Sequence, residues 1–96
     1  MTYVEAQKQI AELQILKTSF SPRYYPEGQQ ALGFSTPQEY KAWWNKIDEV
    51  QEQLEETYRF PKQNPPSAEE LQNLQNYRRE IDKASFDRIA LAKKYL

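Results

Sequence analysis

The stretch that decides the fold is residues 35–60, which read STPQEYKAWWNKIDEVQEQLEETYRF. Thr36 can cap a helix whose first residue is Pro37, and Glu39 can reach back to the Thr36 amide. At ~100° per residue the apolar side chains fall within an arc of ~120°, and the acids fall on the other side. That apolar stripe comprises Tyr40, Trp43, Trp44, Ile47, Val50, Leu54 and Tyr58. We therefore predict a long amphipathic helix over 37–59, whose stripe the rest of the chain covers.

Two capping boxes predict two more helix starts. Thr2-x-x-Glu5 opens a helix over about 3–17, and Ser67-x-x-Glu70 opens one over 68–94. The proline-rich connection FPKQNPPS is short and stiff, so the second and third helices should fold back as a long antiparallel hairpin. We predict an all-α fold, with residues 1–96 as a single three-helix domain. The expected core comprises Ile10, Leu13, Tyr40, Trp43 or Trp44, Ile47, Leu54, Leu74, Tyr77 and Ile81.

The first helix has apolar residues on two sides. Ile10 and Leu13 belong to one stripe, whereas Val4, Ala11 and Ile15 form a second stripe on nearly the opposite face. Such a helix is either sandwiched between other elements or has one face left for a partner, and we favour sandwiching under the long loop. A second prediction is a symmetric homodimer, either through this face or through Phe86, Ile89 and Leu96, which lie off the main stripe of the third predicted helix.

Composition excludes most kinds of chemistry. The chain of 96 residues has no cysteine and no histidine, so disulfides, the common zinc ligands and imidazole catalysis are all missing. With two glycines it has no glycine-rich phosphate loop. We expect no enzyme activity, no metal and no cofactor. The first residues lack the pattern of a secretory signal and no apolar run approaches ~20 residues, so we expect a cytoplasmic protein that does not enter a membrane.

Residues 19–35, SFSPRYYPEGQQALGFS, form a long irregular loop rich in aromatic side chains. Either these side chains pack over the helices as a lid on the core, or they form a recognition surface. The two interpretations are compatible if Phe20, Leu32 and Phe34 point inward. Arg23, Tyr24 and Tyr25 would then be the outward anchors, because arginine and tyrosine are favoured in interfaces.

Charge is uneven along the chain. Residues 48–56 hold five acids and no base, whereas the end of the third predicted helix holds Arg78, Arg79 and Arg88 among other bases. Arg88 lies in the apolar stripe. Either its stem follows the core while the guanidinium reaches solvent, or it is an interface or buried-pair residue, because a guanidinium is not buried without a partner. Nucleic-acid binding by this basic end is an alternative function, although the net charge of −1 argues against it.

By elimination we predict a small non-catalytic protein–protein interaction module: an adaptor, an assembly chaperone or an inhibitor of a larger complex. Residues 65–82, PPSAEELQNLQNYRREID, resemble small phage tail-assembly chaperones, a likeness that capping and amphipathicity can produce by themselves. A phage-encoded inhibitor would have the same character. The predicted partner-binding residues are Arg23, Tyr24, Tyr25, Arg78, Arg79 and Arg88.

Overall fold

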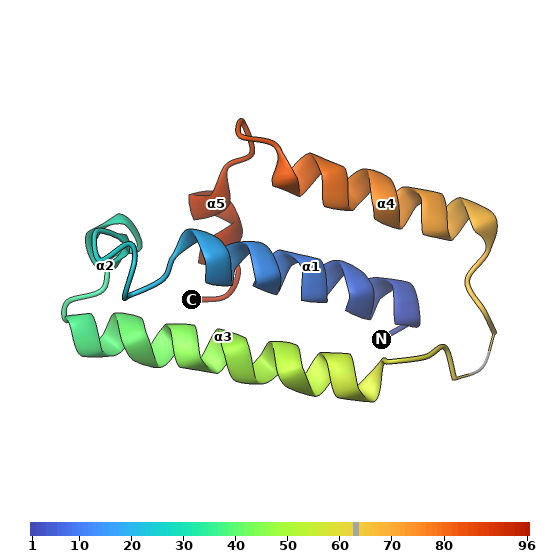
Figure 1. The fold of residues 1–96 in the computed structure, drawn as a ribbon, viewed down its shortest axis with the longest axis horizontal. Helices are drawn as coiled ribbons and strands as arrows, with labels where there is room; N and C mark the ends of the chain where they lie inside the picture. Colours follow the sequence, from blue (N-terminus) through green and yellow to red (C-terminus); the bar gives the residue numbers. More distant parts are fainter. Residues whose placement is uncertain (63) are drawn as a thin grey trace.

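A computed structural model describes residues 1–62 and 64–96. Within these residues the chain is all-helical, with five helices and no strand (Figure 1). The helices are α1 (Tyr3–Ser19), α2 (Gly28–Ala31), α3 (Pro37–Thr57), α4 (Ala68–Asp82) and α5 (Arg88–Lys93). The α3–α4 connection includes residue 63, so the prediction of a stiff linker falls partly outside the described residues.

The three predicted caps are present. Thr2 and Ser67 each form a complete capping box with the glutamate three residues later. At α3 the Glu39 amide donates to Thr36 Oγ1 over 3.2 Å, and Pro37 occupies the first turn. Thr36 Oγ1 also donates to Glu39 Oε1, so this glutamate bonds the hydroxyl rather than the expected Thr36 amide. These local bonds satisfy amides that a helix start leaves without partners.

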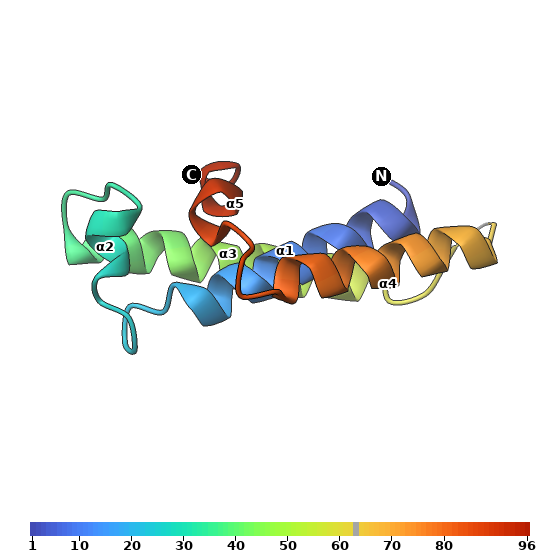
Figure 2. The same ribbon diagram turned by 90° about the horizontal axis from the view of Figure 1, so that it is seen from above.

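The central element is α1, which packs against α3, α4 and α5. In Figure 1 it lies between α3 and α4, which run antiparallel on either side of it. The predicted direct hairpin of the two long helices is therefore not what forms. The two apolar sides of α1 explain this, because each side needs a helix to cover it. The result is a flat molecule with extents of 44 × 28 × 19 Å, and α5 lies on one face of the layer (Figure 2).

The predicted single helix over 68–94 is wrong, because it breaks between Asp82 and Arg88. Asp87 starts α5 by accepting a hydrogen bond from the Ala90 amide over 3.0 Å. The turn brings α5 back across α1, where Leu91 and Ala92 are buried. Burial of these two side chains against α1 therefore outweighs continuation of the helix here.

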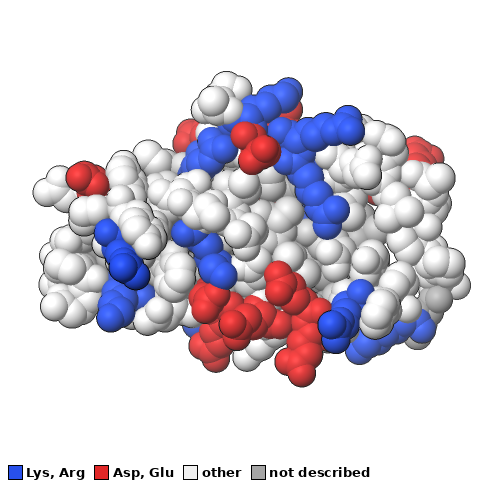
Figure 3. All heavy atoms as spheres, viewed as in Figure 1, with Lys and Arg blue, Asp and Glu red and all other residues white. Residues whose placement is uncertain are grey.

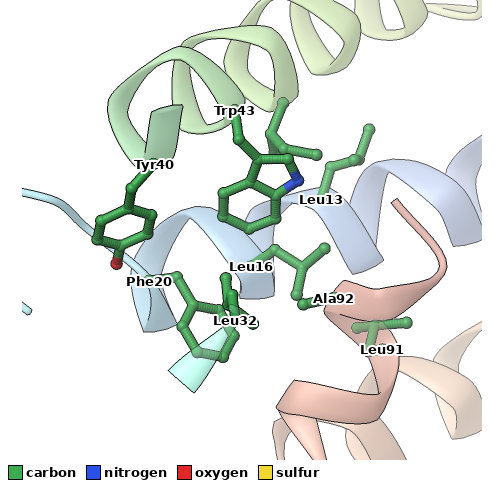
Figure 4. Close-up of a cluster of buried hydrophobic side chains, with 9 residues drawn as sticks. Leu13, Leu16, Phe20, Leu32, Tyr40, Trp43, Leu91 and Ala92 are labelled. Carbon is green, nitrogen blue, oxygen red and sulfur yellow. The ribbon is translucent and has the colours of Figure 1, made fainter. Parts of the chain in front are cut away.

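The core lies where the C-terminal half of α1 meets α3, α5 and the loop before α3 (Figure 4). Trp43 is buried there and donates from Nε1 to the Tyr95 carbonyl over 3.0 Å, whereas Trp44 is only half-buried. Of the predicted core, Ile10, Leu54 and Tyr77 are half-buried as well. The buried cluster comprises Leu13, Leu16, Phe20, Leu32, Tyr40, Trp43, Ile47, Leu91 and Ala92.

Candidate protein-binding surfaces

The loop between α1 and α2 is held by its own backbone and by α3. The Tyr25 amide donates to the Ser21 carbonyl over 2.7 Å, and the Tyr24 amide donates to Ser21 Oγ over 3.4 Å. From α3, the Tyr40 hydroxyl donates to the Tyr25 carbonyl over 3.0 Å. Tyr40 passes so close to Gly28 that a side-chain carbon there would overlap its hydroxyl. Burial, followed by nearby Tyr25 and Glu27, raises the pKa of Tyr40 to about 12.

A hollow of about 530 Å³ opens between this loop and α3. Tyr24 is 78% exposed on its rim, and the Arg23 guanidinium lies 5.3 Å from the centre of the Tyr24 ring. On the α3 side, Trp44 is fixed by a 3.0 Å hydrogen bond from its Nε1 to the Lys17 carbonyl. We call this the loop hollow; it is lined by Ser21, Pro22, Arg23, Tyr24, Lys41, Trp44 and Asn45.

The side chains of Tyr25 and Arg88 both make contacts within the chain itself. Tyr25 is 40% exposed, and its ring lies 6.2 Å from that of buried Phe20, so it packs toward the core and does not line the loop hollow. The Arg88 guanidinium donates to the carbonyls of Asp82, Lys83 and Phe86 over 3.1–3.3 Å. These bonds hold the turn between α4 and α5. Of the predicted loop anchors, Arg23 and Tyr24 are the two that lie together at a hollow.

Arg78 and Arg79 lie at a second hollow of about 500 Å³, on the line where α1 passes between α3 and α4. Its floor is partly apolar, and its two walls carry opposite charge. In Figure 3 acidic side chains gather over α3 and basic ones over α4, with uncharged surface between. We call it the α1 groove; it is lined by Ile10, Ala11, Gln14, Ile15, Gln51, Glu55, Arg78, Arg79, Ile81 and Asp82.

Gln51 is a buried polar residue that lines the α1 groove. Its side chain is 4% exposed, and its Nε2 donates to Gln14 Oε1 over 2.8 Å and to Glu55 Oε1 over 3.1 Å. Its Oε1 is buried and has no hydrogen-bond partner among the described residues. Buried acceptors are nearly always satisfied, so this oxygen is an exception among the described residues.

The two hollows lie along one face of α3. Trp44 lines the loop hollow and Gln51 lines the α1 groove, and residues seven apart point in nearly the same direction from a helix. Between them, Asp48 forms an ion pair with Lys17 of α1. The predicted partner-binding residues therefore belong to two neighbouring surfaces rather than to one.

Sequence reasoning missed Glu12, which is buried among apolar side chains on the opposite face of α1 at 7% exposure. It accepts hydrogen bonds from the hydroxyls of Tyr77 and Tyr95, the latter over 2.5 Å, and Lys94 Nζ lies 3.4 Å away. Burial, and then the hydrogen bond to Glu12, raises the pKa of both tyrosines above its usual range. One signal was available: Glu12 precedes Leu16 by one helical turn, which places it at the edge of the buried stripe.

No protein-family model matches this sequence, no curated protein is significantly similar to it, and no solved structure gives a significant match. In the part of the chain that the structure describes, no helix combines the length and the apolar character needed to cross a bilayer.

Proposed function

We propose that this protein is a non-catalytic module that binds another protein through the loop hollow, as an adaptor, an assembly chaperone or an inhibitor would. One observation carries the proposal: Tyr24 is a large aromatic residue that is held in the open beside a hollow on a rigid loop. Exposed aromatic and arginine anchors next to a pocket are typical of the residues that dominate protein interfaces.

The lining of the loop hollow defines the chemistry of the partner. Arg23 and Lys41 supply two cations, whereas Tyr24 and Trp44 supply aromatic surface. A protein segment with an acidic side chain and a neighbouring apolar side chain would pair with both features. The Arg23 guanidinium already lies over the Tyr24 ring, so both side chains lose little freedom when a partner binds.

The loop is organised before binding, which lowers the entropic cost of association. Its backbone is bonded to Ser21 on one side and to the Tyr40 hydroxyl on the other, and Phe20 anchors its start in the core. We expect the loop to keep this conformation in the complex.

The test is affinity capture from a lysate of the native organism, comparing wild type with Tyr24→Ala. Phe60→Ala is the matched control, because Phe60 is exposed to a similar degree, at 70%, but does not line the loop hollow. We expect a partner that is lost with Tyr24→Ala and kept with Phe60→Ala, while circular dichroism and the melting temperature are the same for all three proteins.

Three outcomes would overturn the proposal. Equal capture by wild type and Tyr24→Ala would exclude the loop hollow, and loss with both variants would point to a general effect of exposed aromatic residues. Recovery of nucleic acid alone, with an affinity that falls steeply as salt rises, would favour the alternative in which the bases of α4 and α5 contact phosphates.

A further inference from the structure

The α1 groove leaves one face of the helical layer open. On the opposite face, α5 covers α1 with Leu91 and Ala92, which pack into the cluster around Leu13 and Leu16. On the open face Ile10, Ala11 and Ile15 remain only half-buried. Domains usually bury such a face against a second layer, which the described residues do not supply.

We propose that a second copy of this chain occupies the α1 groove, in a symmetric dimer whose two-fold axis runs parallel to α1. This inference concerns a different surface from the loop hollow and does not depend on the partner proposed above. Two features support it: the charge of the groove walls and the size of the open face.

The charges of the two walls fix the direction of the axis. Glu55 on α3 and the pair Arg78 and Arg79 on α4 line the same groove, so they lie at one level along α1. Glu52 and Glu56 line the adjoining hollow and extend the acidic wall, beside one base, Arg59. A half-turn about an axis parallel to α1 keeps that level and exchanges the two walls. Arg78 and Arg79 of each copy then lie opposite the acidic wall of the other copy.

The other two-fold arrangement is unfavourable. If the axis ran across the helices, α3 would lie on α3 and α4 on α4. Acidic side chains would then meet acidic ones, and Arg78 and Arg79 would meet their own copies. Like charges placed together at an interface disfavour association, so the charge pattern selects the parallel axis.

With the axis parallel to α1, the arginine wall of the second copy lies over Glu55 on α3, whose carboxylate accepts a hydrogen bond from Gln51 Nε2 over 3.1 Å. Asp82, which lines the groove on the α4 side, reduces the positive charge of that wall without reversing it.

The open face is large enough for such a dimer. The layer measures 44 × 28 Å across, and a standard interface takes ~800 Å² from each partner. The loop hollow stays free, because Lys41 lies fourteen residues before Glu55, or ~20 Å away along α3. Both loop hollows of the dimer would then open at the same end.

The test is a charge-exchange experiment read by sedimentation equilibrium between about 1 and about 200 µM. We expect wild type to reach twice the 11.5 kDa of one chain. The variant Glu52→Arg/Glu55→Arg makes both walls basic, and Arg78→Glu/Arg79→Glu makes both walls acidic. Each alone should dissociate at least tenfold more readily, whereas an equimolar mixture of the two should recover the mass of a dimer.

Ala11→Arg is a second variant, in case the charge exchanges disturb the fold. It places a charged side chain on the groove floor and should leave a monomer with unchanged circular dichroism. Wild type that remains monomeric at the highest concentration would overturn the inference, as would a dimer that is indifferent to all three variants. A homodimer of one exchanged variant as tight as wild type would overturn the parallel axis. Tyr24→Ala should leave the dimer intact, so failure here and failure of the proposed function are separable.

Discussion

Glu12 is a charged residue placed among apolar side chains, and its neighbours make that tolerable. Two tyrosine hydroxyls donate to its carboxylate and Lys94 lies within ion-pair distance. The donors come from α4 and from the end of the chain, so this one side chain connects α1 to both. A buried carboxylate without such donors would be strongly destabilising.

Replacing Tyr77 or Tyr95 with phenylalanine should show how much these donors contribute. Each substitution removes a hydroxyl that bonds a charged oxygen, and we expect each to lower the free energy of unfolding by about 1–3 kcal/mol. Urea unfolding followed by circular dichroism measures this. Tyr24→Phe is the control, because the Tyr24 ring is largely exposed, and it should change stability by less than about 0.5 kcal/mol. Equal losses in all three variants would contradict the role of Glu12.

The same tyrosines predict how stability depends on pH. The folded state raises the pKa of Tyr77 and Tyr95 above that of a free tyrosine, and raises that of Tyr40 to about 12. The unfolded chain therefore loses these protons first, near pH 10, while the folded chain keeps them. The contribution to stability is complete below pH 10 and is lost as pH rises above it. The melting temperature should fall as the pH is raised from about 8 to about 11.5. It should fall less steeply for the double variant Tyr77→Phe/Tyr95→Phe.

Among single residues, helix periodicity predicted the aromatic stripe of α3 but could not rank Trp43 and Trp44. Adjacent residues diverge by ~100°, so one is more central, and the ranking depends on where α5 and the end of the chain lie. Trp43 is the more buried of the two, because it packs in the cluster that includes Leu91 and Ala92, and its Nε1 donates to the Tyr95 carbonyl. Trp44 meets Lys17 instead, at the loop hollow.

At the scale of elements, α5 is a helix of six residues that depends on its docking. An isolated helix of this length is unstable in water, so Leu91 and Ala92 must hold it against α1. We expect Leu91→Ala to cost about 2–5 kcal/mol in thermal or urea unfolding. Ile89→Ala in the same helix is the matched control, because Ile89 is 40% exposed, and it should cost less than about 1 kcal/mol. A similar small cost at both positions would mean that α5 is not docked.

The starts of α1, α3 and α4 could be predicted because capping is local: a threonine or serine and a glutamate three residues later are visible in the sequence. The break after Asp82 could not. No proline or glycine marks residues 83–87, and apolar residues continue at helical spacing beyond them. The turn is set by contacts distant in sequence, in which Leu91 reaches the core and Arg88 bonds the carbonyls at the end of α4.

At the scale of the whole molecule, the sequence showed that α1 has two apolar sides but not which elements cover them. The answer, α3 on one side and α4 on the other, creates the α1 groove and places Arg78 opposite Glu55. The sequence indicated the acidic and basic stretches separately, and neither stretch reveals that they face each other across one helix. The loop anchors were easier to foresee, since an exposed arginine and tyrosine in a long loop need little tertiary context.

The flat shape gives a prediction for the dimer in solution. One chain has a Cα radius of gyration of 14.6 Å and is 19 Å thick. Two layers stacked face to face would have their centres ~10–19 Å apart. The dimer would then have a radius of gyration of about 15–17 Å, because its square is the sum of the squares of the single-chain radius and of half the separation. Chains joined end to end, ~44 Å apart, would give about 26 Å. Small-angle X-ray scattering at a concentration where the mass is that of a dimer separates these values. A radius near 26 Å would place the contact at the ends of the molecule and remove the α1 groove from the interface.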